Sequence, residues 1–233
     1  MIWFPIAFYP RRTNDSRSDL DSATKLGDSF AMQILRTQRQ LEWGELDVPL
    51  FGLDRDWNGE AVDPAAGWCL VQDKVALWLI ASRQASAVVH PDAIPGEFRE
   101  ELWRWDVAEL FIAARDRSRY LELNLAPQGA WWACLFEGPR VASEVPLAES
   151  SGIETFADPD SSFSWTAAAR IPLEFLREQL NFNDRSPVNI TFIIDSPQQK
   201  FLSSADLGPG EPDFHRPQAF QVPRWIEIDV PAS

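Results

Sequence analysis

Residues 102–132 bring aromatic rings together with carboxylate and amide side chains. The candidate functional residues of this stretch are Trp103, Trp105, Asp106, Glu109, Tyr120, Glu122, Asn124, Trp131 and Trp132, and His215 joins them from the C-terminal part of the chain. A pyranose ring has a flat apolar C–H face, which indole rings can cover, and a rim of hydroxyls, which carboxylates can bind. The residue types therefore favour a carbohydrate-binding face.

Pairs of carboxylates also raise the question of catalysis. Glycosidases place two carboxyls about 5 to 9.5 Å apart on either side of one bond. Asp106 and Glu109 are a poor pair, because three residues along a strand separate them by about 10 Å and put them on opposite faces. Glu109 and Glu122 could meet the distance on neighbouring strands, roughly 5 Å apart. A glycoside hydrolase using these two residues stays open, although a non-catalytic protein is favoured.

Each candidate also has a purely structural interpretation. Tryptophans are usually buried in cores, and Trp103 is the first choice for an exposed ligand ring. Asp106 could bond backbone amides in a turn. The remaining alternatives are that Glu109 and Glu122 pair with Arg170, Arg115 or Arg119 or hold a structural cation, and that His215 braces a closing loop.

Short apolar runs separated by Pro, Gly, Asp and Asn predict an all-β fold, an antiparallel β-sandwich of jelly-roll type with one short helix. The predicted strands are 46–52, 67–72, 75–82, 107–114, 118–125, 130–136, 163–170, 188–195 and 224–230. The helix is expected at 171–180, where Pro172 stands near its start. Residues 1–40 are expected to form a lead-in and residues 41–233 the sandwich. The run at 29–41 could be a helix or a strand.

Alternation assigns faces to the strands that carry the candidates. In "YLELNL", Leu121, Leu123 and Leu125 point into a core, so Tyr120, Glu122 and Asn124 share the other face. A tight turn at 115–118 makes this strand the neighbour of 107–114. Trp131 and Trp132 must point to opposite faces of their strand, so at most one of them belongs to the core.

Composition excludes several classes of partner. The 21 Lys+Arg and 35 Asp+Glu residues give a net charge of −14, which disfavours nucleic acids and anionic membranes. No apolar run approaches the ~18 residues of a membrane span. Cys69 and Cys134 are predicted to be free thiols.

The first residues do not have the pattern of a signal peptide, which favours a cytoplasmic protein. The oligomeric state is left open.

Five segments in the right order resemble the family 9 carbohydrate-binding modules and the DOMON-like domains related to them. "WRWDVAELF" resembles a W-x-x-D-x-x-E-x-F strand, and "YLELNLAPQG" resembles the Y-x-E-x-x-x-x-P-x-G that follows it. "VALWLIASR", "WTAAARIPLEFL" and "PDFHRPQAF" match an early strand, a W-x-x-x-x-x-I-P-x-x-x-L segment and a closing P-D-F-H-x-P-x-x-F motif. The resemblance spans about residues 43–230.

The resemblance implies a β-sandwich that holds the end of a sugar chain between aromatic rings, often with structural calcium and no other cofactor. It implies a role in polysaccharide catabolism, which a secreted or periplasmic protein would suit better than a cytoplasmic one. Members often carry a Ser-Trp pair before the closing motif, where this chain has Ser203 and Ser204. That departure favours a rival hypothesis, a structural or interaction sandwich that has lost sugar binding.

Overall fold

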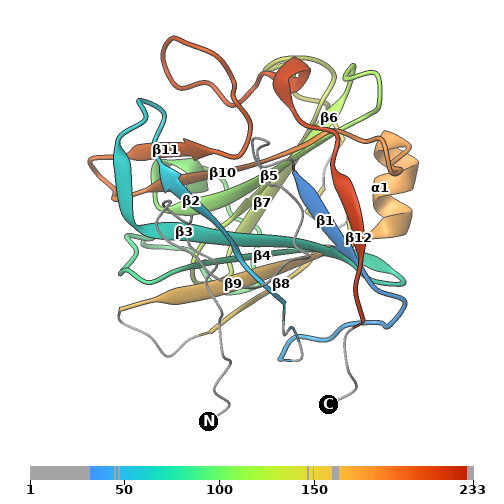
Figure 1. Cartoon of the computed structure of the whole chain (residues 1–233), viewed down its shortest axis with the longest axis horizontal. Helices are drawn as coiled ribbons and strands as arrows, with labels where there is room; N and C mark the ends of the chain where they lie inside the picture. Colours follow the sequence, from blue (N-terminus) through green and yellow to red (C-terminus); the bar gives the residue numbers. More distant parts are fainter. Residues whose placement is uncertain are drawn as a thin grey trace, which may run out of the picture.

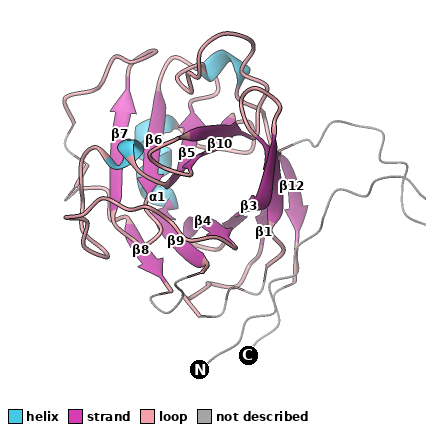
Figure 2. Ribbon diagram, turned by 90° about the vertical axis from the view of Figure 1, so that its left-hand side faces the viewer, coloured by secondary structure: helices cyan, strands magenta, loops and turns pink. Residues whose placement is uncertain are grey.

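Two β-sheets face each other across an apolar core, and one short helix lies at their edge (Figure 1). The computed structural model describes residues 32–229 apart from 45, 47, 146, 149 and 159–162. The predicted all-β sandwich with one short helix is confirmed. Figure 2 shows β5, β6, β7 and β10 in the upper layer and β4, β8 and β9 in the lower one.

The larger sheet has seven strands, in the order β12-β1-β3-β4-β9-β8, with β2 also paired to β3. They are β1 (Gln33–Arg36), β2 (Phe51–Arg55), β3 (Ala61–Gln72), β4 (Ala76–Arg83), β8 (Glu154–Ala157), β9 (Trp165–Pro172) and β12 (Arg224–Glu227). β1 runs parallel to β3 and β12, while the other pairs are antiparallel. Within the run at 29–41, whose structure the sequence left open, Gln33–Arg36 form a strand, so the sheet begins before the predicted boundary at residue 41. Residues 1–31 of the predicted lead-in lie outside the described residues.

The smaller sheet has five strands in the order β11-β10-β5-β6-β7. They are β5 (Val107–Ala113), β6 (Tyr120–Leu125), β7 (Trp131–Phe136), β10 (Val188–Ile194) and β11 (Lys200–Ser203). β5 is the central strand, and all seven of its residues are buried. A turn closed by the Ala114 and Arg119 backbones joins β5 to β6, as the sequence predicted.

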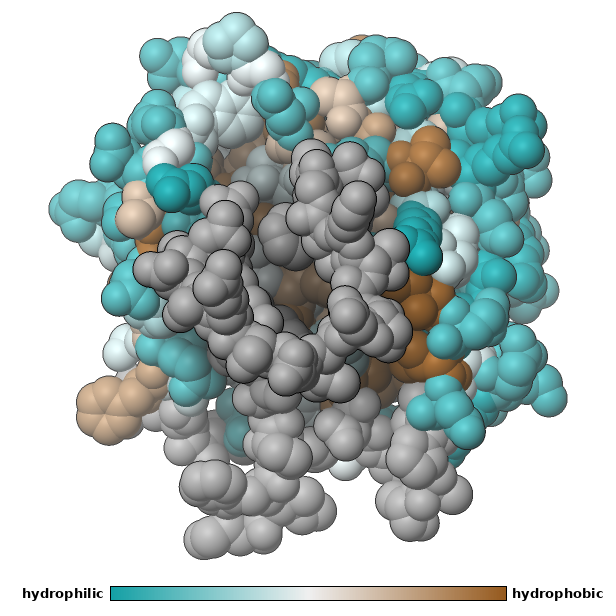
Figure 3. Space-filling view, in the orientation of Figure 1, coloured by the Kyte–Doolittle hydropathy of each residue, from teal (hydrophilic) through white to brown (hydrophobic). Residues whose placement is uncertain are grey.

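Alternating side chains from both sheets form the core between the layers. Leu121, Leu123 and Leu125 of β6 lie in it, together with Leu110 of β5 and Leu79 of β4. Continuous burial of such side chains is the dominant source of stability for a sandwich. On the face shown in Figure 3, hydrophilic residues occupy the periphery and hydrophobic ones gather nearer the centre.

Loops cover the outer face of the smaller sheet. A second apolar cluster forms there, in which Leu102 comes from the loop before β5, and Leu207, Phe214 and Phe220 come from the segment after β11. Two 3-10 turns, η1 (Leu102–Arg104) and η2 (Pro217–Ala219), lie in these coverings. Both faces of the smaller sheet are therefore shielded from solvent, so a ligand can reach its polar residues only past these loops.

Several predicted boundaries were wrong. The strand expected at 46–52 is found at Phe51–Arg55, because Leu46, Val48 and Leu50 pack as irregular chain onto the outer face of the larger sheet. The four-residue strands β8 and β11 were missed, since so few residues show no clear alternation. Helix α1 (Leu173–Leu180) follows β9 directly and ends at Asn181, which adopts the left-handed conformation.

Candidate functional site

A row of polar side chains crosses the outer face of the smaller sheet. The strand register aligns Thr191 of β10 with Glu109 of β5, Glu109 with Asn124 of β6, and Asn124 with Trp132 of β7. Residues of one strand that point away from the core share a face, so Glu122 and Asn189 lie on this face as well. We call Glu109, Glu122, Asn124, Asn189, Thr191 and Trp132 the polar row.

Glu109 is held by its neighbour on β10. Thr191 donates its hydroxyl to Glu109 Oε2 at 2.6 Å. The side chain is almost completely buried, and burial raises the pKa of Glu109 to about 7 against the opposing effect of the Thr191 hydrogen bond.

Glu122 lies diagonally across from Glu109, because its direct partners in the register are Phe111 and Cys134. Its Oε2 is buried without a hydrogen-bond partner. Burial, and then the charge of Glu109, raise the pKa of Glu122 well above its usual value. The two acids were predicted to lie on neighbouring strands, and they do; neither is engaged by an arginine hydrogen bond within the described residues.

Asn124 is the residue of the row whose hydrogen bonds are least satisfied. It is fully buried, and neither its Oδ1 nor its Nδ2 has a hydrogen-bond partner in the described structure. The amide lies close enough to Glu122 to lower the pKa of that acid, although the two form no hydrogen bond of good geometry. Buried polar groups in proteins nearly always have partners, so this amide needs a water or a ligand.

The serines that replace the expected Ser-Trp pair hold Asn189 in place. Ser203 and Ser204 donate their hydroxyls to Asn189 Oδ1 at 3.1 and 2.8 Å, and the Ala205 amide donates to the same oxygen at 3.0 Å. The Asn189 Nδ2 is left without a partner. Ser203 and Ser204, which stand where members of the resembled family often carry a Ser-Trp pair, thus orient a second amide of the row, that of Asn189.

Tyr120 and His215 close one end of the row. The Arg140 amide donates to the Tyr120 oxygen at 3.2 Å, so the tyrosine hydrogen is free to point at His215 Nδ1, 2.7 Å away. Burial lowers the pKa of His215 to about 4, which keeps the ring neutral with its proton on Nε2. Nε2 lies 3.6 Å from Glu122 Oε2, and the ring packs on Phe136. His215 therefore braces the covering loop and also faces the row.

Asp106 has a structural place. Its Oδ1 accepts a hydrogen bond from the Ser196 amide at 2.9 Å, and its Oδ2 accepts one from the Val88 amide at 3.2 Å. The carboxylate thus ties the start of β5 to the loop after β4 and to the turn after β10. Both of its oxygens are occupied by backbone, as the structural interpretation of its sequence position anticipated.

The four clustered tryptophans separate in the fold. Trp131 lies in the core between the sheets, where its Nε1 donates to the Gly96 carbonyl at 3.3 Å, whereas Trp132 is half-buried on the opposite face. Trp103 is 49% exposed, with the Arg104 guanidinium 5.1 Å from its ring, and Trp105 packs edge-on to His90. Of the four, only Trp132 is aligned with a residue of the polar row, Asn124.

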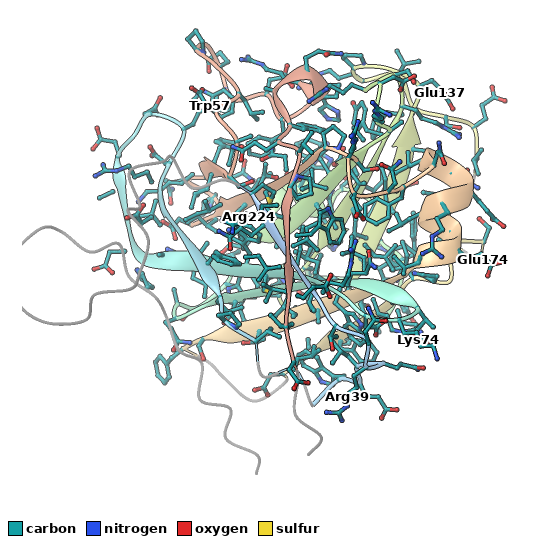
Figure 4. The ribbon with its side chains drawn as sticks, turned by 45° about the vertical axis from the view of Figure 1, so that its right-hand side comes forward. Arg39, Trp57, Lys74, Glu137, Glu174 and Arg224 are labelled. Atoms are coloured by element: carbon teal, nitrogen blue, oxygen red, sulfur yellow. The ribbon has the colours of Figure 1, made fainter. Side chains whose placement is uncertain are left out.

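The alternation of "VNITFII" could have identified two residues that the sequence analysis missed. It places Asn189 and Thr191 on the side of β10 away from the core. A third, Trp57, gave no such signal. It lies at the turn after β2, beside the loop that carries His215 (Figure 4), and its Nε1 donates to the Gly210 carbonyl at 2.7 Å.

The described residues contain no group of three or more His, Cys, Asp or Glu that could hold a metal ion. Structural calcium stays a prediction. No described helix is long and apolar enough to cross a membrane. Cys69 and Cys134 are free thiols, as predicted.

Comparisons with known proteins identify the fold. No family model matches the chain. The UPF0462 protein C4orf33 homolog of Danio rerio is 27% identical over 135 residues, which are 56% of this chain and 65%, less than two thirds, of that relative.

Solved structures extend the comparison to most of the chain. A candidate carbohydrate-binding protein from Bacteroides uniformis matches 83% of this chain and 99% of its own, with a TM-score of 0.63 and 14% identity. A family 9 carbohydrate-binding module from Caldicellulosiruptor kristjanssonii, solved with cellotriose and with glucose, matches 86% of this chain and 99% of its own at TM-scores of 0.55 and 0.54 and 11% identity. The chain therefore has the fold of the family 9 carbohydrate-binding modules.

Proposed function

We propose that this protein binds a small carbohydrate, without catalysis, at the polar row on the outer face of the five-stranded sheet. The observation that carries the proposal is the Asn124 amide, fully buried with neither polar atom partnered, beside the unpartnered Oε2 of Glu122. A scaffold selected only for stability would gain by replacing such groups with apolar ones. The unpartnered atoms of these two side chains therefore support a ligand that completes their hydrogen bonds.

The chemistry of the row suits a sugar. Hydroxyl groups both donate and accept, so they can satisfy Asn124 Oδ1, Asn124 Nδ2 and Glu122 Oε2 together. Trp132 stands at the end of the same row, where its ring can cover the apolar face of a pyranose. The fold supports the same class of ligand, since its structural neighbours include modules solved with glucose and cellotriose.

The burial of the row limits the size of the ligand. Glu109, Glu122 and Asn124 are at most 5% exposed, so solvent and ligand reach them only if a covering segment moves. The segment after β11 packs on this face of the sheet, and its His215, anchored to Tyr120, lies 3.6 Å from Glu122 Oε2. We infer that the ligand is a monosaccharide or the terminal residue of a chain and that it enters when this segment opens.

Calorimetric titration with a panel of mono- and oligosaccharides tests the proposal. We expect heat of binding for at least one sugar at millimolar concentration, and its loss in Asn124→Leu. Trp43→Ala is the matched control that should bind normally, because Trp43 stacks on Phe156 of the larger sheet and not on the sheet that carries the row. The absence of heat with every sugar would overturn the proposal in favour of a structural or interaction domain.

A glycoside hydrolase using Glu109 and Glu122 is the second candidate. It is favoured by one observation, that these two buried acids lie diagonally across neighbouring strands and that burial raises the pKa of both. Hydrolysis requires one carboxyl to act as an acid and the other to be ionised. Release of reducing sugar from an oligosaccharide, lost in Glu122→Gln, would support this candidate; binding without release would reject it. A role in polysaccharide catabolism is part of the proposed carbohydrate binding. The cellular location, cytoplasmic or secreted, stays a prediction.

A further inference from the structure

The polar row carries two acids and no basic group that neutralises them. Within the described residues, neither Glu109 nor Glu122 accepts a hydrogen bond from Lys or Arg. The titratable or charged groups near the pair are Tyr120 on β6, Cys134 on β7, Arg140 after β7, and Asp213 and His215 in the covering segment, while β10 contributes only Asn189 and Thr191.

None of these groups supplies a free positive charge. Arg140 Nη2 donates to Asp213 Oδ1 at 2.8 Å, its side chain is 62% exposed, and its charge lowers the pKa of Glu122 by less than burial raises it. His215 is neutral because burial lowers its pKa to about 4. Cys134 and Tyr120 are uncharged, since burial raises the pKa of each to about 11 and about 12. Two buried carboxylates without a counter-ion are costly, so the free protein keeps protons on the pair at neutral pH.

The unsatisfied atoms of the site match a donor-rich cation. Glu122 Oε2 is buried without a hydrogen-bond partner, and so is Asn124 Oδ1, which lies directly opposite Glu109 in the register. An ammonium group has three donors and no acceptor. Trp132, next in the row, provides a ring face that attracts a cation. The amide is a second observation that points to a ligand, independent of the two acids.

The geometry points to an amino sugar: the site takes a saccharide whose protonated amine lies between Glu109, Glu122 and Asn124. This inference rests on the proposed function and names the ligand class of the same site. A neutral sugar would meet a protonated acid pair, whereas an ammonium group stabilises both carboxylates in their ionised form. Binding of the amine therefore releases protons from the protein.

Calorimetry with matched ligands tests the inference. The probes are glucosamine, galactosamine and mannosamine, each compared with its neutral parent hexose and its N-acetyl derivative at pH 6.5. We expect at least one amine to bind about tenfold more tightly than both of its uncharged counterparts, since a gain of about 1.4 kcal/mol corresponds to that factor. Titrations in two buffers of different ionisation enthalpy should report net proton release for the amine and none for the neutral sugar. This second measurement uses the unaltered protein and does not depend on any variant folding.

Variants then assign the effect to the acids. Glu122→Gln should remove both the preference for the amine over its neutral parent and the proton release. Asp92→Asn alters an exposed acid that is paired with Arg99, and it is the matched control. It should change neither the preference for the amine nor the proton release. Equal affinity for amine and neutral parent would overturn the inference and leave the proposed function standing. Binding of Ca²⁺ in place of the amine would also overturn it, and no binding of any sugar would overturn the proposed function itself.

Discussion

The hydroxyl of Tyr120 lies 2.7 Å from Nδ1 of His215, and this contact joins β6 to the segment that covers the polar row. The two residues are 95 positions apart in the chain, so the bond is purely tertiary. It lies next to the acids, because His215 Nε2 is 3.6 Å from Glu122 Oε2. Its strength therefore sets how firmly the cover is held over the site.

Removing the Tyr120 hydroxyl should loosen the cover. Tyr120→Phe leaves His215 Nδ1 and the Arg140 amide without their partner, which costs roughly 1 to 3 kcal/mol. Hydrogen exchange measured by mass spectrometry should become faster in residues 205–220 and stay unchanged in β4. Sugar association should also become faster. Unchanged exchange in the covering segment would contradict the role assigned to this contact.

Glu109 should make stability depend on pH. In the folded protein its pKa is raised to about 7, whereas the unfolded value is about 4.5, so the folded state holds the extra proton between these values. The free energy of unfolding therefore falls as pH rises from 4.5 to 7, by on the order of 3 kcal/mol for this group.

Comparison with Glu109→Gln isolates this effect. Glutamine can still accept the Thr191 hydrogen bond but does not titrate. The difference in unfolding free energy between the native protein and the variant, from urea denaturation, should shift in favour of the variant across this range and then level off. His215 works in the opposite direction, since its lowered pKa costs stability as pH falls below 6.5, but it is present in both proteins and cancels. A constant difference would rule out a buried, proton-holding Glu109.

Two asparagines of the polar row should respond oppositely to the same substitution. Asn124→Leu removes an amide with no protein partner and should raise the unfolding free energy by about 1 to 3 kcal/mol while abolishing ligand binding. Asn189→Leu removes an acceptor of three hydrogen bonds and should lower it by roughly 2 to 4 kcal/mol. Urea denaturation measures both. A loss of stability in Asn124→Leu would show that the amide has a structural role instead.

Adjacent tryptophans should separate stability from binding. Trp131→Ala empties a core position and should cost about 3 to 5 kcal/mol of unfolding free energy. Trp132→Ala, on the half-buried outer face, should cost less stability and should weaken sugar affinity by about tenfold, equal to about 1.4 kcal/mol. Thermal melting and calorimetry measure the two effects. Normal sugar affinity in Trp132→Ala would remove it from the site.

The sequence by itself determined which side chains share a face. Strict alternation was enough to send Leu121, Leu123 and Leu125 inward, to group Glu122 with Asn124, and to separate Trp131 from Trp132, because the pleat of a strand has a period of two. The short turn before Tyr120 was enough to make β5 and β6 neighbours.

The tertiary structure decided which of those residues form a site. Three features depend on segments that local periodicity does not relate. They are the register that sets Glu109 opposite Asn124, the hydrogen bond from Thr191, 82 residues away, and the position of His215 beside Glu122. Asp106 illustrates the same limit: only the packing of two distant loops shows that backbone amides occupy both of its oxygens. Which strands pair, and which loops pack on the sheet, depends on contacts between distant segments. The face on which a side chain lies depends only on its own strand.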